Sequence, residues 1–346
     1  MELVFPDLLT LGLVERERMD DLARSTVFGQ MFPFGSQAGE AVTWDRLDSL
    51  VGTMPGRTPG EPLQVLNPRG LVRKSIPASY FGAQMPLDLK KVIGAGQPGT
   101  LGQKLNLTEE LNRMNTDLAF RERQTIDYQL SALALRGDVP IFDDKGTVVK
   151  SIKWEGHSDQ IEVLGSGDEF SNLATSDPIK VLRSIGTSRY RGSGYSYING
   201  VIYVSQRGAN VILSSDAIRA DLKGRFGSST VTLDMFNDAF RGSLPRIEIV
   251  EDGVHLADGN WQPLIEDHKM LIVGSHVQRG TRLGEWTITT NEQMGVGENI
   301  YANVRMPNEF PANPIVERAL QGAPNLYGDK QLVVVEFADP NDILTF

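Results

Sequence analysis

Few side chains of this sequence combine the types and spacing that metal binding or catalysis requires. The chain has no cysteine, which excludes thiolate metal sites, disulfides and cysteine nucleophiles. Among its four histidines, His268 and His276 are eight positions apart, about 26 Å along an extended strand. That distance is too long for two ligands of one metal unless the chain folds back at Gly274. We therefore interpret the histidines as structural or surface residues, and we predict no metal, no cofactor and no catalytic residue.

Pairs of adjacent acidic residues could in principle serve glycoside hydrolysis, which uses two carboxyl groups. They are Asp20-Asp21, Asp143-Asp144 and Glu251-Asp252. Adjacent acids on turns are also common on solvated surfaces, and no catalytic motif accompanies these pairs. We expect the protein not to be an enzyme, with a carboxylate-based hydrolase of mixed fold as the alternative.

A glycine-rich string at residues 94–99 matches the G-x-G-x-x-G pattern of dinucleotide-binding loops. That function requires a strand before the string and a helix that begins inside it. Pro98 and the residues up to Asn106 break this context, so we interpret the glycines as a hinge that precedes a helix.

Arginine and tyrosine alternate in one later stretch of the sequence, which contains Arg183, Arg189, Tyr190, Arg191, Tyr195 and Tyr197. Such a strip can stack and bind single-stranded nucleic acid, but both residue types are also enriched at protein interfaces. Lysine and arginine total 34 against 44 acidic residues, and the net charge of −10 repels phosphate. The charge favours the interface, and a single-strand nucleic-acid-binding module remains a further alternative.

The chain has 346 residues, of which 40% are hydrophobic and 23% charged, as in folded proteins of two or three domains. Its longest aliphatic runs fall far short of the roughly 18 residues of a membrane span. We therefore predict a folded protein without a membrane helix.

A proline-rich region interrupts the first third of the chain. Six of the eighteen prolines fall between positions 55 and 86, a density that neither a helix nor a central strand accommodates. The flanking residues 42–51 and 71–81 have the composition of short strands, which predicts a two-stranded arm with an irregular tip at 54–70. An isolated ribbon is marginally stable, so we expect the arm to lie on another copy, with an ordinary basic loop as the alternative. From residue 49 to residue 81 the charged residues are Arg57, Arg69, Arg73 and Lys74 against the single Glu61, which makes this stretch locally basic.

The next region predicts a long helix. Residues 106–136 contain no proline or glycine and carry apolar residues mostly three, four or seven positions apart. Asn106 and Glu109 resemble a capping box, and Gly137 is a stop signal, so the helix should be about 45 Å long. Its polar face should be solvated, with Arg113, Asp117, Arg121, Glu122 and Asp127.

The remainder predicts alternating strands and short helices. A hairpin is expected over 139–154, and Asp177-Pro178 has the pattern of a cap that begins a helix through Ser184. Further helices are expected from Ser214 or Ser215 to Lys223 and over 233–240. Strands are expected over 201–205, 247–250, 270–273, 286–290 and 332–337, with a proline-rich segment at 307–324 between the last two.

The order of these elements resembles that of the major capsid proteins of tailed bacteriophages. Among these proteins, the local sequence is most similar to the lambda-type major capsid protein E family. The matching stretches are residues 57–62 (RTPGEP), 72–77 (VRKSIP), the charged helix 108–136, 269–274 (KMLIVG), 279–284 (RGTRLG) and 332–335 (LVVV). The resemblance extends from about Thr43 over most of the chain and rests more on the order of elements than on any one string.

The resemblance implies an α+β fold, the tailed-phage major capsid protein fold. Its expected parts are an N-terminal arm (1–42), an extended β-hairpin loop (43–88), a peripheral domain (89–170) with a spine helix (107–136), an axial domain (171–299) and a C-terminal return to the peripheral domain (300–346). Candidate contact residues between subunits are Arg57, Glu61, Arg69, Arg73, Lys74, Arg189, Tyr190 and Arg191.

The implied function is self-assembly into hexamers and pentamers of an icosahedral or prolate head shell. The shell would lie in the virion and enclose double-stranded DNA without sequence-specific binding. Implied partners are a portal, a decoration protein and a separate scaffolding protein, because the stretch before the hairpin is too short for a fused scaffold. No lysine–asparagine crosslinking pair of the kind some capsids use can be matched, so we expect noncovalent stabilisation.

Overall fold

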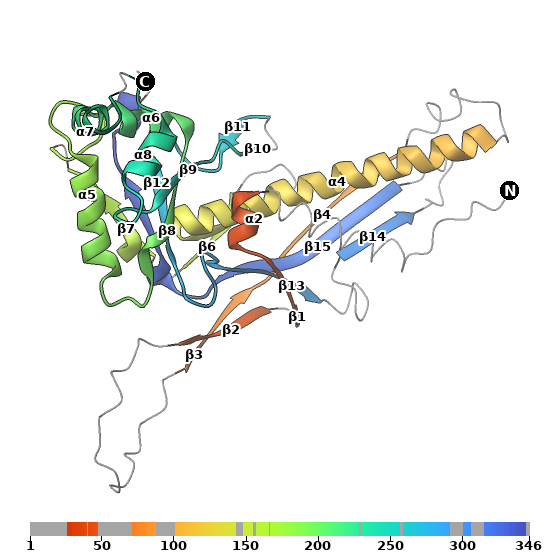
Figure 1. Cartoon of the computed structure of the whole chain (residues 1–346). Coiled ribbons are helices and arrows are strands. Elements are labelled where there is room, and N and C mark those ends of the chain that lie inside the picture. The colour runs from red at the N-terminus through yellow and green to blue at the C-terminus, as the bar shows by residue number, and fades with distance from the viewer. Residues whose placement is uncertain are drawn as a thin grey trace, which may run out of the picture.

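The computed structural model describes residues 26–39, 41–47, 71–87, 101–142, 148–154, 157–165, 167–227, 230–256, 259–290, 300–305 and 315–343. The arrangement is elongated: one long helix runs along a sheet, and a second sheet with short helices lies at one end of that helix (Figure 1). Within the described residues, no helix has both the length and the apolar character needed to cross a membrane.

The first sheet, called here the spine sheet, is built around the twelve-residue strand β15 (Ile315–Leu326). Gly322 pairs with Ser79 of β4 (Ser79–Pro86) and with Ile288 of β13 (Gly284–Thr290), so β4 and β13 lie on opposite edges of β15. Strand β14 (Ile300–Arg305) pairs with the first half of β15, and β1 (Phe34–Ala38) runs parallel to β13.

The long helix α4 (Leu101–Arg136) has 36 residues and is therefore about 54 Å long. It ends as predicted, because Gly137 adopts a φ of +68° and its N–H bonds to the carbonyl of Leu133. The predicted capping box is wrong, since the helix begins at Leu101 and Asn106 lies inside it. Asparagine lowers helix stability by well under about 1 kcal/mol, so the favourable neighbours continue the helix through it.

The buried end of α4 differs from its far end. Residues 126–135 are buried without exception, as in a helix enclosed on all sides. Polar side chains there bond to backbone groups: the Ser131 hydroxyl donates to the carbonyl of Leu264 at 2.5 Å. In the preceding part, Met114 and Leu118 pack on Val316 of the spine sheet.

The second sheet, called here the end sheet, has the order β7 (Ile161–Val163), β16 (Leu332–Glu336), β12 (Lys269–Ser275), β8 (Ser196–Val204) and β9 (Arg246–Ile249). Alternate residues of its central strands enter two cores: Leu271 and Val273 join the core that contains the buried end of α4, while Met270 and Ile272 join the core under the helices. Burial on both faces explains why these strands are continuous apolar runs in the sequence. The covering helices are α5 (Pro178–Ile185), α6 (Gln206–Ser214), α7 (Asp216–Phe226), α8 (Leu233–Ala239) and α9 (Pro340–Ile343).

Three two-stranded ribbons complete the described part. The predicted arm is confirmed at its base, where β2 (Ala41–Leu47) pairs antiparallel with β3 (Leu71–Pro77). The ribbon extends away from the rest of the chain (Figure 1), and Trp44 stacks on Trp154 at 4.9 Å between ring centroids. The predicted hairpin is also confirmed, as β5 (Asp138–Phe142) and β6 (Val148–Lys153). The third ribbon joins β10 (Gly253–His255) and β11 (Trp261–Pro263). The first helix of the described residues, α2 (Val27–Met31), packs on α4.

Two further expectations needed correction. The proline-rich segment 307–324 was expected to separate strands, but from Ile315 onward it forms the central strand β15. Pro324 is tolerated there because it lies beyond Gly322, where the β4 pairing ends. The polar face of the helix was expected to be solvated throughout, whereas Glu122 and Asp127 are 7% and 5% exposed. Helix α6 was not predicted, and the glycine string 94–99 lies outside the described residues.

Candidate assembly surfaces

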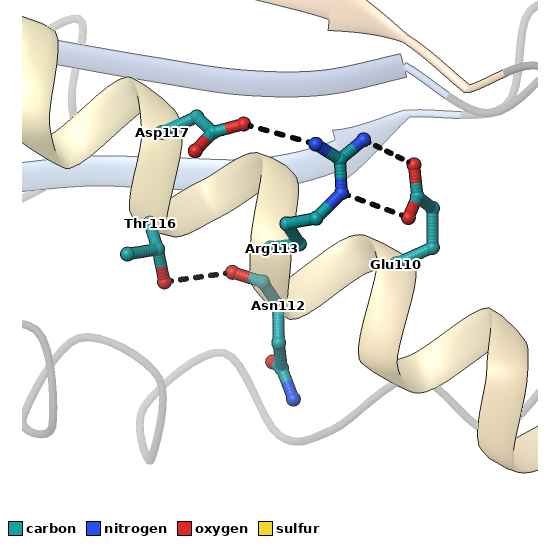
Figure 2. Close-up of polar contacts among 5 residues, drawn as sticks. All are labelled: Glu110, Asn112, Arg113, Thr116 and Asp117. Carbon is teal, nitrogen blue, oxygen red and sulfur yellow. Dashed lines mark hydrogen bonds and ion pairs between the residues drawn. The ribbon is translucent and has the colours of Figure 1, made fainter.

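One side of α4 faces solvent and carries charged residues that interact within the helix. Arg113 forms ion pairs with Glu110 at 2.6 Å and with Asp117 at 3.5 Å (Figure 2). The Thr116 hydroxyl donates a hydrogen bond to the carbonyl of Asn112 one turn earlier. These solvated contacts support the helix locally but do not attach it to another element.

A groove with a volume of about 1040 Å³ follows this side of α4 from Thr116 to Thr125 and ends at the buried residues Tyr128 and Gln129. Residues 79–83 of β4 form one part of its lining, and the β10–β11 ribbon contributes Val254, His255 and Leu256. The groove contains two strongly exposed aromatic side chains, since Tyr80 is 60% and Phe120 55% exposed.

The sequence contains a signal for Phe120 that was missed. Phe120 lies off the apolar face marked by Leu111, Met114 and Leu118, among the charged residues of the opposite face. An aromatic residue at such a position on a helix is a candidate contact residue, because the subunit's own core does not bury it.

The groove is close to electrically neutral. Apart from tyrosines, the titratable side chains of its lining are Asp117, Arg121 and His255, so one carboxylate offsets one guanidinium. The whole chain has a net charge of −10. The groove is therefore a neutral patch on an acidic protein.

On the opposite side of α4, a buried ion pair attaches the helix to the spine sheet. Arg318 of β15 is 1% exposed, and its Nε donates to Oε2 of Glu122 at 2.5 Å. Its Nη1 also donates to Oδ1 of Asn115 at 3.3 Å. Two helix residues seven positions apart therefore contact one arginine, which fixes the position of α4 along β15.

A second buried ion pair attaches the helix to the start of the described chain. Arg123 donates to Asp127 through Nη2 at 2.5 Å and through Nε at 3.0 Å. The same guanidinium donates to Oγ1 of Thr26 at 2.6 Å, and Thr26 also caps α2. Burial raises the pKa of Asp127 to about 6, although the Arg123 charge acts in the opposite direction. Burial lowers the pKa of Arg123.

The predicted strip of arginine and tyrosine residues does not form a continuous surface. Tyr190 and Tyr197 are core residues that are 4% and 9% exposed. The Tyr197 hydroxyl donates to the carbonyl of Leu182 at 2.7 Å, and the Tyr190 hydroxyl lies 3.0 Å from the carbonyl of Ile272. Burial raises the pKa of both hydroxyls above their usual range. The choice of Tyr190 as a surface contact residue is therefore corrected: the end sheet buries it within the subunit.

The other predicted contact residues have different positions. Arg189 is half-buried and donates to Glu162 at 2.9 Å, which ties the π-helical turn Gly186–Tyr190 to β7. Arg191 and Arg73 are exposed, and Lys74 is half-buried in β3. Arg57, Glu61 and Arg69 lie outside the described residues.

Metal-ligand geometry does not occur in the described residues, where no group of three or more histidine, aspartate or glutamate side chains converges. His276 lies against the ring of Tyr195, with 5.6 Å between centroids, and His268 lies 3.4 Å from Glu266. Burial lowers the pKa of His268. Both contacts are those of structural histidines.

The architecture is that of a tailed-phage coat subunit, in which a long helix lies on one sheet, a second sheet is covered by helices, and a ribbon extends from the body. The family model for phage major capsid protein E matches residues 13–313, and the chain belongs to this family. No curated protein matches the sequence.

Solved structures support the same fold. A protein described as the capsid protein of a prophage from E. coli CFT073 is 14% identical with a TM-score of 0.62, and the match covers 96% of this chain and 99% of that one. A phage-related protein from Bordetella bronchiseptica RB50 is 12% identical with a TM-score of 0.50, covering 93% and 96%. A chain of the satellite phage P4 procapsid, in a structure that includes the size determination (Sid) protein, is 9% identical with a TM-score of 0.52, covering 98% and 93%.

The protein is therefore a structural protein that assembles with its own copies into a capsid shell, and it is located in the virion head. The sequence-based assignments of family, fold and shell-forming function are confirmed. The two alternatives, a carboxylate-based hydrolase and a single-strand nucleic-acid-binding module, receive no support from these comparisons.

Proposed function

We propose that copies of this chain form the hexamers and pentamers of a phage head shell, and that the β2–β3 ribbon is the part of each subunit that reaches onto its neighbour. The ribbon and its connection, residues 41–77, correspond to the greater part of the expected extended loop 43–88, whereas β4 at the end of that range pairs with β15 in the spine sheet. Residues 171–299 correspond to an axial domain that surrounds the centre of each ring, and residues 1–42 to an arm that crosses to another copy.

The length of the connection at the end of the ribbon carries this proposal. The two strands pair from Ala41 with Pro77 to Leu47 with Leu71, and residues 48–70 join them. A β-hairpin needs about two to five connecting residues, and connections beyond about 12–15 residues usually have a function of their own. Within the described residues, the subunit holds the ribbon at its base, where Val42 and Ile76 are buried and Trp44 stacks on Trp154. A long connection on a ribbon held at one end suits contact with another copy.

The partners proposed besides further copies are a separate scaffolding protein, a portal and a decoration protein. The enclosed DNA is proposed to meet a surface that does not bind it tightly or read its sequence. The net charge of −10 supports this, since an acidic lining repels phosphate and leaves packaging and ejection unhindered.

Electron microscopy of the protein, expressed alone and with the neighbouring phage genes, tests the proposal. We expect closed shells, or rings of five and six subunits. A compact monomer under both conditions, with a radius of gyration near 20 Å by scattering, would contradict the proposed assembly.

A pair of loop replacements tests the role of the ribbon. Replacing residues 48–70 by Asn-Gly should leave the subunit folded and prevent shell formation, because the connection is lost while the β2–β3 pairing remains. The matched control replaces the turn 143–147 of the β5–β6 hairpin by Asn-Gly, and this variant should assemble. If the first variant formed normal shells, the connection 48–70 would not be needed for assembly and the proposed role of the ribbon would be wrong.

A further inference from the structure

The β12–β13 turn (residues 276–280) presents the most exposed large apolar side chain of the described residues. Val277 is 96% exposed at its tip. The N–H groups of His276 and Gly280 each donate to the other's carbonyl at 2.8 Å, which closes the turn. Gln331, which is 1% exposed, donates through Nε2 to the carbonyl of Gly280 at 3.1 Å. A buried side chain therefore holds the turn in one shape, although Val277 touches little of its own subunit.

Two arginine residues flank this apolar tip. Arg279 lies over the ring of Tyr327, 4.3 Å from its centroid, Arg282 follows three positions later, and both arginines are exposed. Burial raises the pKa of the Tyr327 hydroxyl, and the two guanidinium charges act in the opposite direction, which places both near the ring. Within the described part of the chain neither arginine forms an ion pair, and the nearby carboxylate of Glu285 accepts from the Tyr327 hydroxyl. The turn is therefore an apolar tip with a basic rim, on a chain with a net charge of −10.

A surface of the opposite character lies at the β10–β11 ribbon. Trp261 is 54% exposed, and its ring covers Gly253, where an added Cβ would lie 2.3 Å from it. Glu251 and Asp252 directly precede Gly253, both are exposed, and neither forms an ion pair with another described residue. These four residues are called here the Trp261 surface. It combines an aromatic ring of the type most enriched at the centres of protein interfaces with two solvated carboxylates.

The two surfaces lie at opposite ends of β12. Ile249, the last residue of β9, is level with Met270 near the start of β12, because both pair with the same residue of β8. The acidic pair follows two residues after Ile249, at that end of the sheet, whereas the β12–β13 turn follows Ser275 at the other end. Five strand steps from Met270 to Ser275 span about 17 Å. The turn and the Trp261 surface therefore do not contact each other within one subunit.

Their chemistry is complementary across a contact between two copies. Arginine is attracted both to carboxylates and to the face of a tryptophan ring, and an apolar tip covers such a ring well. A ring of copies closes through a contact between two different surfaces of neighbouring subunits, and a knob at one end of β12 with a receiving surface at the other end meets this condition. Phosphate would also attract the arginines, but the apolar tip suits a protein surface and adds nothing to phosphate binding.

We propose that in rings of this protein the β12–β13 turn of one copy docks on the Trp261 surface of the next copy, with Val277 against the indole ring and the two arginines facing the acidic pair. The proposal rests on the proposed assembly into rings, and it adds a contact between end sheets that the β2–β3 ribbon does not make. The subunit already fixes the shape of the turn, so docking orders little further chain, which favours binding.

An exchange of charges tests this pairing. Arg282→Glu and Glu251→Arg should each lower the yield of shells at least about tenfold, because each places like charges at the contact. The variant with both changes keeps the net charge of −10 and restores opposite charges in reverse order. Its yield should therefore return to within about threefold of the wild type.

Controls separate the contact from the stability and the charge of the subunit. Both altered side chains are exposed, so the thermal midpoints of the unassembled variants should equal the wild type. Arg183→Glu makes the same charge change as Arg282→Glu on the exposed side of α5, away from the proposed contact, and should assemble normally. Single variants that assemble like the wild type, or a double variant that assembles no better than the single ones, would overturn the proposal.

A photo-reactive amino acid at position 277 identifies the occupant. Irradiated shells should yield a species of two chains, and mass spectrometry should locate the crosslink within residues 251–263 of the second copy. A crosslink to nucleic acid, to a different protein or to another part of the second copy would overturn the proposal. Shells that form without any crosslink would overturn this contact and leave the proposed function intact, whereas failure of the wild type to form rings or shells would count against the proposed function and this contact together.

Discussion

The buried pair of Arg318 and Glu122 allows a quantitative test of how α4 is fixed on the spine sheet. Both side chains are almost fully buried, at 0% and 7% exposed, with 2.5 Å between Nε and Oε2. Arg318→Met removes the cation and leaves the buried carboxylate of Glu122 without its arginine. Glu122→Met leaves the buried guanidinium of Arg318 without its carboxylate. Removing one partner of a buried ion pair costs about 3–5 kcal/mol, so each single variant should lose that much free energy of unfolding.

The double variant distinguishes an ion pair from two independent packing effects. With methionine at both positions neither charge of this pair remains, and such replacements are often neutral or stabilising. Asn115 loses one partner, which costs about 1–3 kcal/mol, so the double variant should lie within about 3 kcal/mol of wild type. The two single losses together are about 6–10 kcal/mol, and the coupling energy should therefore be at least about 3 kcal/mol.

Urea unfolding of unassembled subunits, at fixed protein concentration and followed by far-UV circular dichroism, measures these differences. Arg113→Met is the matched control on the exposed side of the same helix, where the ion pairs with Glu110 and Asp117 are solvated, and its midpoint should equal the wild type (Figure 2). If a single variant unfolds during expression, the yield of soluble double variant still reports rescue. A loss below about 1 kcal/mol for Arg318→Met, or additive losses in the double variant, would refute the reasoning.

Three other predictions concern the stop signal of α4, the pKa of Asp127 and the expected noncovalent stabilisation of the shell. Gly137→Ala should cost at least about 1 kcal/mol of the free energy of unfolding and so lower the thermal midpoint, because φ is +68° and the new Cβ would lie 2.3 Å from His157. The control Gly224→Ala, in open space within α7, should raise the midpoint slightly. Because the pKa of Asp127 is about 6 in the folded state and 3.8 for an unperturbed aspartate, its contribution favours folding at low pH and is lost as the pH rises from about 4 to about 6. The stability of wild type relative to Asp127→Asn should therefore fall by about 3 kcal/mol over that window in urea titrations, and a constant difference would contradict the assignment. Mature particles boiled in detergent should run as a single band near 38.1 kDa, and a ladder of covalent multimers would disprove noncovalent stabilisation.

Periodicity and capping signals predicted much of the fold because they act over a few residues. Asp177 caps α5 by accepting from the N–H of Lys180, as its position before a proline indicated. Gly137 ends α4 for the equally local reason that a left-handed residue is required there. The strands of the end sheet were recognisable as apolar runs because both of their faces are buried.

Long-range contacts set the limits of prediction from the sequence. Glu122 and Asp127 are residue types typical of a solvated helix face. Their burial is favourable because each pairs with an arginine: Glu122 with Arg318, 196 positions later, and Asp127 with Arg123 of the same helix. Tyr190 was expected at an interface but is buried within the subunit. The sequence does not distinguish the two environments, because a tyrosine in either one has an apolar side and a hydrogen-bond partner. β15 was missed because its proline is tolerated only where the neighbouring strand ends, and the register of β4 decides that position.

The contact of Arg318 with two turns of α4 has a mechanical consequence. Two layers resist bending far better when they cannot slide over each other, and an arginine that is held by residues 115 and 122 prevents such sliding between helix and sheet. Over the length of their contact, α4 and β15 should therefore behave as one stiff bar. When identical subunits adapt to different curvatures in a closed surface, we expect the distortion to fall outside this bar, at the base of the β2–β3 ribbon.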